Sequence, residues 1–413
     1  MRTYGVARTS EGLYGTIASM TPVVLALLLL CSSTPGAQSG DLAARDRAGA
    51  QAMRDGRFDE AVAMYREVTQ LAPRLPGGWY ALGQAYNAIK QAALRTFGEQ
   101  PEDAPWRQLL TADALLANSQ LTDAFVLYRA TLERLPSMVS IHDSVARIYE
   151  KTGHAAWAAR ERATGALSPA DCAKRTALCE FRAGRYRTAL TAAQAQPDAE
   201  SRYWRARAAN ELALAAFKRL DGLADSAERR SVRATRARAE ERYTDAVAEL
   251  KAALTFAPGD PALIDELGAL LYLARDFEQA VATLSPLLQA HPEEARLLEV
   301  VGYSLLQLRR VEEALPILQR AVERDPTDPG PRLALGRAYL QNGDFAAAIP
   351  LIEAQLAGDQ DGSLHVQLAR AYTGLGQRDK AAALLVRSQE LQRAADERHA
   401  AANQRRITAP KNW

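Results

Sequence analysis

A repeat of about 34 residues runs through the chain and constrains its fold more than any other feature. A small residue recurs at nearly constant spacing, at Gly268, Gly302, Gly336 and Ala369. An alanine recurs with the same spacing, at Ala280, Ala314, Ala348 and Ala381. Self-similarity at a fixed period of this length is typical of proteins that stack one structural unit many times.

Each unit has the pattern of two short amphipathic helices. In the first regular unit, Leu267 and Leu271 lie on one apolar stripe at helical spacing. Ala280, Leu284 and Leu287 form the stripe of the second helix. A single hairpin cannot bury both stripes, whereas stacked hairpins can. The pattern therefore predicts an all-α solenoid.

The repeat carries a recognisable motif. Its first half, aromatic-x-x-Leu-Gly-x-x-Tyr, is present as Trp79-x-x-Leu82-Gly83-x-x-Tyr86 and in part as Leu335-Gly336-x-x-Tyr339. Its second half recurs as Phe58-Ala61-Tyr65-Pro73, Leu121-Ala124-Tyr128-Pro136 and Tyr243-Ala246-Leu250-Ala253-Pro258. These motifs resemble the tetratricopeptide repeat, a helical hairpin of the same length. The resemblance implies a right-handed superhelical solenoid of about nine to ten hairpins.

The regular spacing breaks twice, after Tyr86 and after Trp204, where apolar sequence continues without a turn signal. The two interrupted blocks are similar to each other, which suggests duplication of a multi-repeat block. A polar, alanine-rich end is expected of a helix that caps a solenoid. The expected parts after the leader are an N-terminal array over 38–165, an irregular helical joint with degenerate repeats over 166–226, a regular C-terminal array over 227–388, and a capping helix with a loose tail over 389–413.

Residues 1–37 form a predicted leader. Residues 21–31 are an uncharged apolar run of eleven residues, with arginines before it and small polar residues after it. A run this short spans a bilayer poorly, since about 20 residues are needed. It is typical of a secretory signal peptide that is cleaved near Gly36 or Ala37. A single anchor helix and a buried core helix are the alternatives.

Cys31 lies where a bacterial lipoprotein signal places its acylated cysteine. The residue before it is Leu30, however, and that processing step prefers a small side chain. Lipidation at Cys31, with a lipid anchor as its result, is therefore an alternative to simple cleavage. No later segment is apolar enough to cross a membrane, so the sequence predicts a periplasmic or extracellular mature protein.

Two cysteines remain after the leader, Cys172 and Cys179. Export would permit a disulfide between them. In one continuous helix their Cα atoms would be roughly 10 Å apart, which is too far for a bond. A bond therefore requires Cys172 to lie in a loop after Pro169, before the helix begins. Two buried thiols are the alternative, and a metal site is not expected because no histidine is nearby.

Composition and motifs argue against two broad function classes. The chain has 51 basic and 49 acidic residues, for a net charge of +2, whereas a nucleic-acid binder needs a basic excess on one face. The five histidines are scattered, and the sequence contains no HExxH, no phosphate-binding G-x-x-x-x-G-K and no G-x-S-x-G elbow. We therefore expect no nucleic-acid partner, no enzymatic activity, no metal and no cofactor.

One charge cluster is a candidate binding site. Within ten residues that contain no acid lie Arg229, Arg230, Arg233, Arg236 and Arg238. Such a patch could bind lipid headgroups, polysaccharide or an acidic partner. The alternative is a solvated helix face that pairs with neighbouring glutamates.

The resemblance also implies a concave groove, lined by the first helix of each hairpin, in which peptides or partner segments bind. In the first array it places Tyr80, Gln84 and Asn87 there. In the second array it places Asp265, Tyr272, Arg296, Glu299, Tyr303, Arg337, Gln341 and Arg370 there. Tyrosine and arginine are enriched at binding hot spots. These positions lack the paired Lys/Asn set with which some family members hold a C-terminal carboxylate.

The combined prediction is a non-catalytic scaffold that binds a partner protein or peptide in the groove, in an envelope or secretion assembly outside the cytoplasm. A membrane-tethered lipoprotein assembly factor is one rival interpretation. An enzyme or carbohydrate-binding module with its site in the 166–226 joint is the other.

Overall fold

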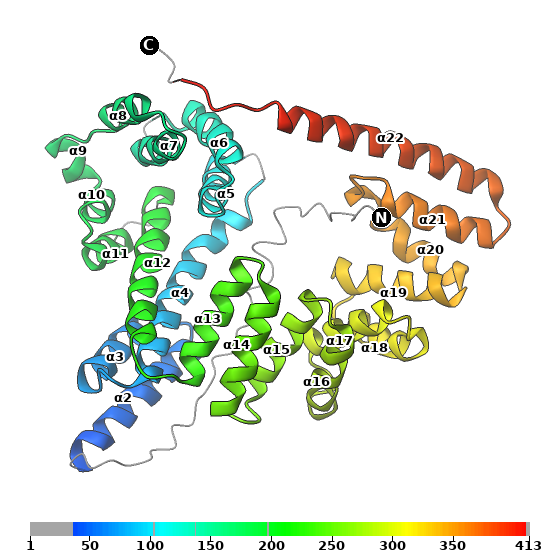
Figure 1. Ribbon diagram of the computed structural model, residues 1–413, viewed down its shortest axis with the longest axis horizontal. Coiled ribbons are helices and arrows are strands. Elements are labelled where there is room, and N and C mark those ends of the chain that lie inside the picture. The colour runs from blue at the N-terminus through cyan, green and yellow to red at the C-terminus, as the bar shows by residue number, and fades with distance from the viewer. Residues whose placement is uncertain (1–35, 102–103, 137, 196–197, 410–413) are drawn as a thin grey trace. The chain divides into compact units, whose positions relative to one another are not determined.

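The structure is a computed structural model, and it describes residues 36–101, 104–136, 138–195 and 198–409. Within these ranges the chain forms 21 α-helices and one 3-10 helix, with no strand (Figure 1). The predicted all-α solenoid is confirmed. The chain divides into two compact units, which we call unit 1 (Met1–Arg229 with Arg405–Trp413) and unit 2 (Arg230–Gln404). Residues 1–35 of the predicted leader, Cys31 among them, lie outside the described residues, and its last two residues begin helix α2.

The helices of unit 1 are α2 (Gly36–Arg54), α3 (Phe58–Leu71), α4 (Pro76–Gly98), α5 (Pro105–Ala117), α6 (Leu121–Arg134), α7 (Val139–Lys151), α8 (Ala155–Thr164), α9 (Pro169–Lys174), α10 (Thr176–Arg182), α11 (Tyr186–Gln194) and α12 (Ala199–Asp221). Helix α13 (Ala227–Ala239) begins in unit 1 and continues into unit 2.

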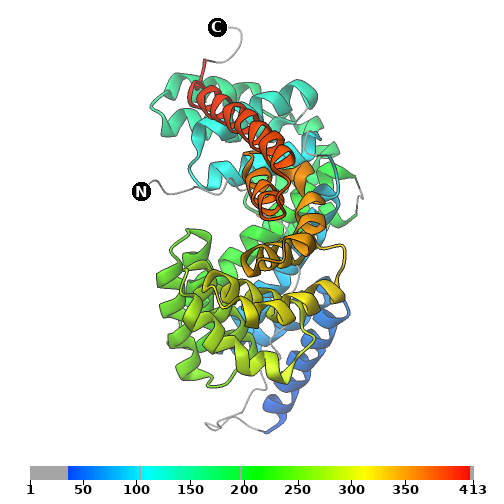
Figure 2. The ribbon, with the colours of Figure 1, turned by 90° about the vertical axis from the view of Figure 1, so that its right-hand side faces the viewer.

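The remaining helices belong to unit 2, where successive hairpins stack on one another (Figure 2). They are α14 (Tyr243–Phe256), α15 (Pro261–Leu273), α16 (Phe277–Ala290), α17 (Ala295–Gln307), α18 (Val311–Arg324), α19 (Pro329–Asn342), α20 (Phe345–Glu353), the 3-10 helix η2 (Leu356–Gly358), α21 (Ser363–Gly374) and α22 (Arg378–Asn403).

The small residues of the repeat lie where the two helices of a hairpin nearly touch. A Cβ atom on Gly268 would lie 2.2 Å from Cγ of Leu284, and one on Gly302 would lie 2.6 Å from Cδ2 of Leu318. An equivalent contact recurs one repeat later with isoleucine in place of leucine, where a Cβ on Gly336 would lie 3.1 Å from Cγ1 of Ile352. The repeated alanines of the second helices are buried as well. The period of the sequence therefore reflects one packing contact made again in each hairpin.

The tight turn inside each hairpin requires a left-handed backbone conformation. Gly343 takes this role in one hairpin with φ 85°, as expected for a residue without a Cβ atom. Arg275 and Arg309 occupy the equivalent position in the two preceding hairpins, with φ of 64° and 59°. Left-handed backbone is unfavourable for residues with a side chain, so these two turns carry local strain.

Unit 2 curves toward its first helices. Helix α15 contacts α17, α17 contacts α19, and α19 contacts α21, although a second helix lies between them in the chain. Among the described residues the second helices α16, α18 and α20 share fewer contacts with one another. The first helices therefore line the inner side of this stack.

In unit 1, α4 and α12 replace the regular hairpin pattern. Each is a single helix of 23 residues, and each begins one of the two interrupted blocks. They pack antiparallel: a Cβ on Gly83 would lie 2.3 Å from Phe217, Nζ of Lys90 lies 3.2 Å from Oδ1 of Asn210, and the Arg202 guanidinium lies 5.8 Å from the Phe97 ring centre. If two copies of one block pack about a two-fold axis, their equivalent helices can contact each other antiparallel, as α4 and α12 do. This supports the predicted duplication.

The 166–226 segment packs back onto the N-terminal array, a contact that the prediction of an irregular helical joint did not include. Tyr203 and Trp204 of α12 share a hydrophobic core with Tyr128 and Tyr149. Farther along α12, Ala208 and its neighbours share a second core with residues of α2, α3 and α4. The cause is the long α4–α12 contact, which joins segments far apart in the sequence.

The C-terminal end also differs from its prediction. Helix α22 is continuous from Arg378 to Asn403, so the predicted cap is an extension of the last hairpin. The described tail residues 405–409 are not helical. They are also not loose, because Ile407 packs against the core of unit 1 that contains Tyr149.

Candidate functional site

Six of the predicted groove residues lie together in unit 2, and we call this set the inner face. Its members come from three first helices: Asp265 and Tyr272 from α15, Arg296, Glu299 and Tyr303 from α17, and Arg337 from α19. Glu299 follows Asp265 by one full repeat, and Arg337 follows Tyr303 by one full repeat. Because the step equals the repeat length, each pair occupies equivalent positions on neighbouring helices.

Contacts between α15 and α17 hold one end of the inner face together. Nε of Arg296 lies 3.3 Å from Oδ2 of Asp265, and the ring centres of Tyr272 and Tyr303 are 6.3 Å apart. The other carboxylate oxygen of Asp265, Oδ1, is buried and has no hydrogen-bond partner among the described residues. This end therefore presents a buried acceptor beside an aromatic pair.

The start of α19 lies beside Tyr303. A Cβ on Gly330 would lie 2.8 Å from the Tyr303 hydroxyl, 3.3 Å from Oδ1 of Asp328 and 3.8 Å from Oε1 of Glu299. The Tyr303 hydroxyl and the Glu299 carboxylate thus both approach the first turn of α19. Asp328 caps α19 through the backbone N–H of Gly330. The middle of the inner face is therefore acidic.

Burial perturbs the acids of this region. It raises the pKa of Glu299, and the nearby Asp328 carboxylate raises it further. Burial also raises the pKa of Asp265, although Arg296 opposes that shift. A buried carboxylate has lost hydrogen bonds to water, and here the protein does not replace all of them. A ligand that supplies N–H groups would therefore stabilise its charged form.

Arg337 is the cation of the inner face. Its Nε donates to Oε1 of Gln367 at 3.0 Å, and burial lowers the pKa of its guanidinium. Among the described residues no carboxylate lies within ion-pair distance of it, whereas Arg296 is paired with Asp265. A half-buried guanidinium without a carboxylate fits an external one, because an arginine can bind a carboxylate through two parallel hydrogen bonds.

Sequence reasoning missed two members of this neighbourhood, Asp328 and Gln367. Asp328 precedes Pro329, a pattern typical of a helix start, and so could have been placed at the start of α19. Gln367 on α21 carries no comparable signal. Its contact with Arg337 depends on the spacing between α19 and α21.

Two predicted residues of the second array stand apart. Gln341 and Arg370 are exposed, and the described residues include no polar partner for either side chain. They lie on α19 and α21, outside the contacts that join the inner face.

The predicted groove residues of the first array are partly buried on α4, beside the residues of that helix that contact α12. On α4, Tyr80 and Asn87 share a helical stripe with Gly83 and Lys90, which contact α12. Gln84 is half-buried on the same helix. The α4–α12 contact thus uses the face that we predicted for a partner.

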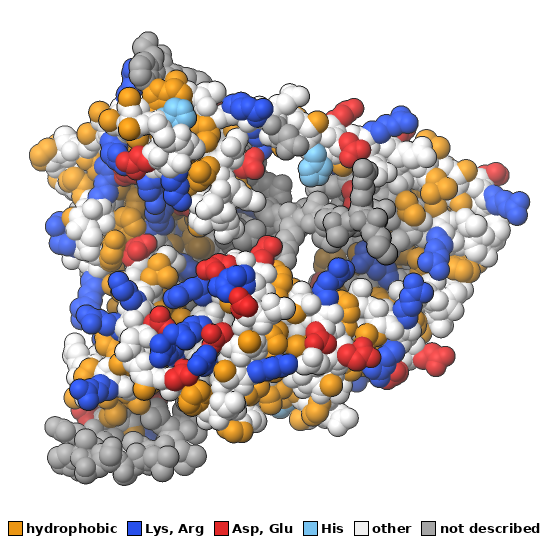
Figure 3. Space-filling model, in the orientation of Figure 1, with side chains coloured by type: hydrophobic (Ala, Val, Ile, Leu, Met, Phe, Trp, Pro, Cys, Tyr) orange, Lys and Arg blue, Asp and Glu red, His pale blue; other side chains and the backbone are white. Residues whose placement is uncertain are grey.

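The arginine cluster is largely neutralised within the chain. Arg229 lies 3.4 Å from Asp221 and Arg230 lies 2.9 Å from Glu249. Arg233 also has an interaction partner, and Arg236 is exposed. Basic and acidic side chains are interspersed over α13 and α14 on the face drawn in Figure 3. This arrangement agrees better with a solvated helix face whose arginines pair with neighbouring acids than with a basic site for an anionic ligand.

The structure joins Cys172 and Cys179 in a disulfide, with Cα atoms 5.5 Å apart. The predicted loop around Cys172 is absent, because Cys172 lies in α9 and Cys179 in α10. Arg175 separates the two short helices with φ −125° and ψ 52°, and this break brings the two cysteines together.

The described residues include no group of three or more histidine, cysteine, aspartate and glutamate side chains that could hold a metal ion. The cavity in the 166–226 segment, lined by Arg175, Glu200 and Trp204, has a volume of about 50 Å³. Pockets for small molecules usually span roughly 300–1,000 Å³. None of the described helices is both long enough and apolar enough to cross a membrane.

Comparison with known proteins gives matches over part of unit 2. A tetratricopeptide repeat family model matches residues 305–367, and a second matches residues 266–329. No curated protein matches the chain. Among solved structures, "MamA 41-end from Desulfovibrio magneticus RS-1" is 22% identical with a TM-score of 0.38, covering 42% of this chain and 98% of its own. "MamA MSR-1 C2" is 23% identical with a TM-score of 0.37, covering 40% of this chain and 95% of its own.

The matched region contains every member of the inner face except Asp265, and it contains the hairpins in which a glycine of the first helix meets Leu or Ile of the second. The motif, its period and the helices that it forms agree with one another, and they identify residues 266–367 as tetratricopeptide repeats.

Proposed function

We propose that this protein is a non-catalytic scaffold that binds an extended segment of a partner protein on the inner face of unit 2. The observation that carries the proposal is Arg337, a half-buried guanidinium whose nearest polar partner is Gln367 rather than a carboxylate. Burial of an unpaired charge is costly, so a ligand carboxylate would gain binding energy there.

The remaining residues define the chemistry of the segment. The Tyr272–Tyr303 pair offers two adjacent rings to an apolar side chain or a proline. Glu299 and Asp328 beside it favour N–H groups or a cation. The partner segment would therefore place an acidic group near α19 and a basic or N–H-rich stretch near α17.

We propose further that the protein acts outside the cytoplasm, in an envelope or secretion assembly. The apolar run in residues 21–31 supports export, and the Cys172–Cys179 disulfide suits an oxidising compartment. Lipidation at Cys31 would tether the same scaffold to a membrane. Partitioning into detergent, lost in a Cys31→Ala variant, would distinguish the tethered form from the free one.

Affinity capture from a bacterial envelope extract tests the proposal. We expect Arg337→Ala and Tyr303→Ala to lower recovery of one defined partner by about tenfold or more, the effect typical of hot-spot residues. Arg324→Ala is the matched control, because Arg324 is exposed on the second helix α18. Recovery that is unchanged in both inner-face variants, or lowered equally in the control, would contradict the proposal.

A further inference from the structure

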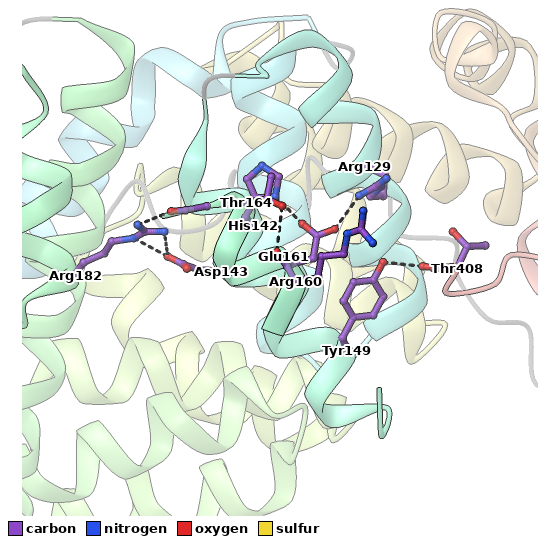
Figure 4. Close-up of polar contacts among 10 residues, drawn as sticks. Arg129, His142, Asp143, Tyr149, Arg160, Glu161, Thr164, Arg182 and Thr408 are labelled. Carbon is purple, nitrogen blue, oxygen red and sulfur yellow. Dashed lines mark hydrogen bonds and ion pairs between the residues drawn. The ribbon is translucent and has the colours of Figure 1, made fainter. Parts of the chain in front are cut away.

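Among the described residues, the C-terminal tail contacts the helices of unit 1 through residues more than 250 positions away in the sequence. The guanidinium of Arg405 lies 2.9 Å from Oδ1 of Asp123. The side chain of Ile407 packs against the hydrophobic core. The hydroxyl of Tyr149 donates a 2.7 Å hydrogen bond to the backbone carbonyl oxygen of Thr408 (Figure 4). Residues 405–409 have no regular secondary structure, so the tail contacts the helices of unit 1 as an irregular peptide segment.

The receiving surface is built by α6, α7 and α8, and we call Asp123, Phe125, Tyr149 and Trp157 the tail site. The ring of Tyr149 lies 5.6 Å from that of Phe125 and 5.4 Å from that of Trp157, centre to centre. Asp123 lies in the first turn of α6, where it remains partly exposed. The tail site therefore combines an aromatic cluster with one carboxylate.

The Tyr149 hydroxyl is a donor suited to a peptide backbone. Burial raises the pKa of Tyr149 to about 12, so the hydroxyl keeps its proton at neutral pH. Its hydrogen-bond acceptor among the described residues is the Thr408 carbonyl. A segment that covers this hydroxyl must supply an acceptor, because a buried hydroxyl without one is unfavourable, and a backbone carbonyl meets this need. A backbone carbonyl is present in every peptide, whatever its sequence.

The Tyr149 hydroxyl does not hydrogen-bond to the polar side chains that lie near it on α6, α7 and α8. Glu161 on α8 is buried and pairs with Nδ1 of His142 at 2.6 Å and with Arg129 at 3.1 Å (Figure 4). These groups satisfy one another within α6, α7 and α8. The Tyr149 hydroxyl takes no part in that network and points instead to the tail.

We propose that the tail site is a peptide-docking site that recognises a cationic residue two positions before an aliphatic one, and that residues 405–408 are its resident, exchangeable occupant. A partner segment of the same chemistry would displace the tail. The exchange is feasible because the ion pair of Arg405 is largely exposed and the other contacts named above are a hydrogen bond and an aliphatic side chain. A segment held by contacts of this kind can open locally without unfolding the unit.

A competition experiment on the full chain tests this site. The probe is a fluorescein-labelled peptide of residues 401–409, and its binding is followed by fluorescence anisotropy. In the wild-type chain the tail competes at high effective concentration. We expect Ile407→Asp, which puts a charge where an apolar side chain packs, to free the site and strengthen probe binding at least tenfold.

Variants of the site itself complete the design. In the Ile407→Asp background, Tyr149→Phe should weaken probe binding several-fold, and Asp123→Ala should weaken it less, because its ion pair is exposed. Tyr339→Phe removes a hydroxyl from unit 2 and should leave binding unchanged. The proposal is overturned if Ile407→Asp binds the probe no better than wild type, if neither chain binds it, or if Tyr149→Phe has no effect while circular dichroism shows a folded chain.

Discussion

Alanine substitution at the repeated glycines should give graded losses of stability that follow the helix–helix clearance. At Gly268 the new Cβ would lie 2.2–2.6 Å from three atoms of Leu284, a fully buried side chain. Overpacking of this kind costs about 1–3 kcal/mol, and alanine regains about 0.5–1 kcal/mol over glycine in a helix. We therefore expect Gly268→Ala to destabilise unit 2 by about 1–2 kcal/mol.

The same substitution at equivalent positions provides the internal control. At Gly336 the atoms closest to the new Cβ would be 3.1 Å away, so a small shift of the neighbouring side chains would make room for it. The overpacking cost and the gain in helix propensity should then nearly cancel, and the free energy of unfolding should change by less than about 0.5 kcal/mol. Gly302→Ala, with a closest approach of 2.6 Å, should fall between them.

Urea unfolding of the full chain, followed by circular dichroism, would measure the series. Hydrogen exchange of peptides from α15 to α20 would assign each change to its hairpin, because a chain with two units need not unfold in one step. Equal losses at the three positions, or the largest loss at Gly336, would refute the argument that the period reflects helix–helix clearance.

Three further predictions concern turns, the disulfide and pH. Arg309→Gly should stabilise unit 2 by up to about 1 kcal/mol in urea unfolding, because Arg309 has φ 59°, whereas Arg310→Gly, at φ −84°, should destabilise it. A gain at Arg310 with none at Arg309 would contradict the strain argument. Reduction of the disulfide, or alanine at both Cys172 and Cys179, should lower the stability of unit 1 by about 2–3 kcal/mol, the loop-entropy value for so short a loop. A chain in which mass spectrometry finds two free thiols after purification without reductant would rule the bond out. Glu299→Gln should raise stability at pH 7. Burial raises the pKa of Glu299 above the value of about 4.3 that a glutamate has in the unfolded chain. The folded chain therefore binds the proton more tightly, and ionisation of Glu299 destabilises the fold as the pH rises above that value. The difference between the variant and wild type should shrink toward pH 4, and a difference that grows there would reverse the assigned sign.

The local part of this fold could be predicted from the sequence. The regular recurrence of Gly268 and Ala280 predicted the hairpins of unit 2, because each hairpin is stabilised by contacts within and next to itself. The same phase placed Tyr303 and Arg337 at equivalent positions of neighbouring first helices.

The non-local part could not be predicted in this way. The contact of α4 with α12 joins segments far apart in the chain, such as Lys90 and Asn210, and neither helix carries a local signal for its partner. That contact covers the stripe of Tyr80 and Asn87 that the repeat alone would leave open. The docking of Ile407 on unit 1 is non-local in the same sense.

Photocrosslinking would test most directly whether the inner face binds a partner protein. A photoreactive phenylalanine analogue would replace Tyr303 on α17 in one full-length variant and the exposed Glu323 on α18 in another. After irradiation in the envelope extract, we predict one distinct adduct at position 303, lost when Arg337→Ala is added, and none at position 323. Equal adducts at both positions, or an adduct at 303 that Arg337→Ala does not diminish, would contradict the account.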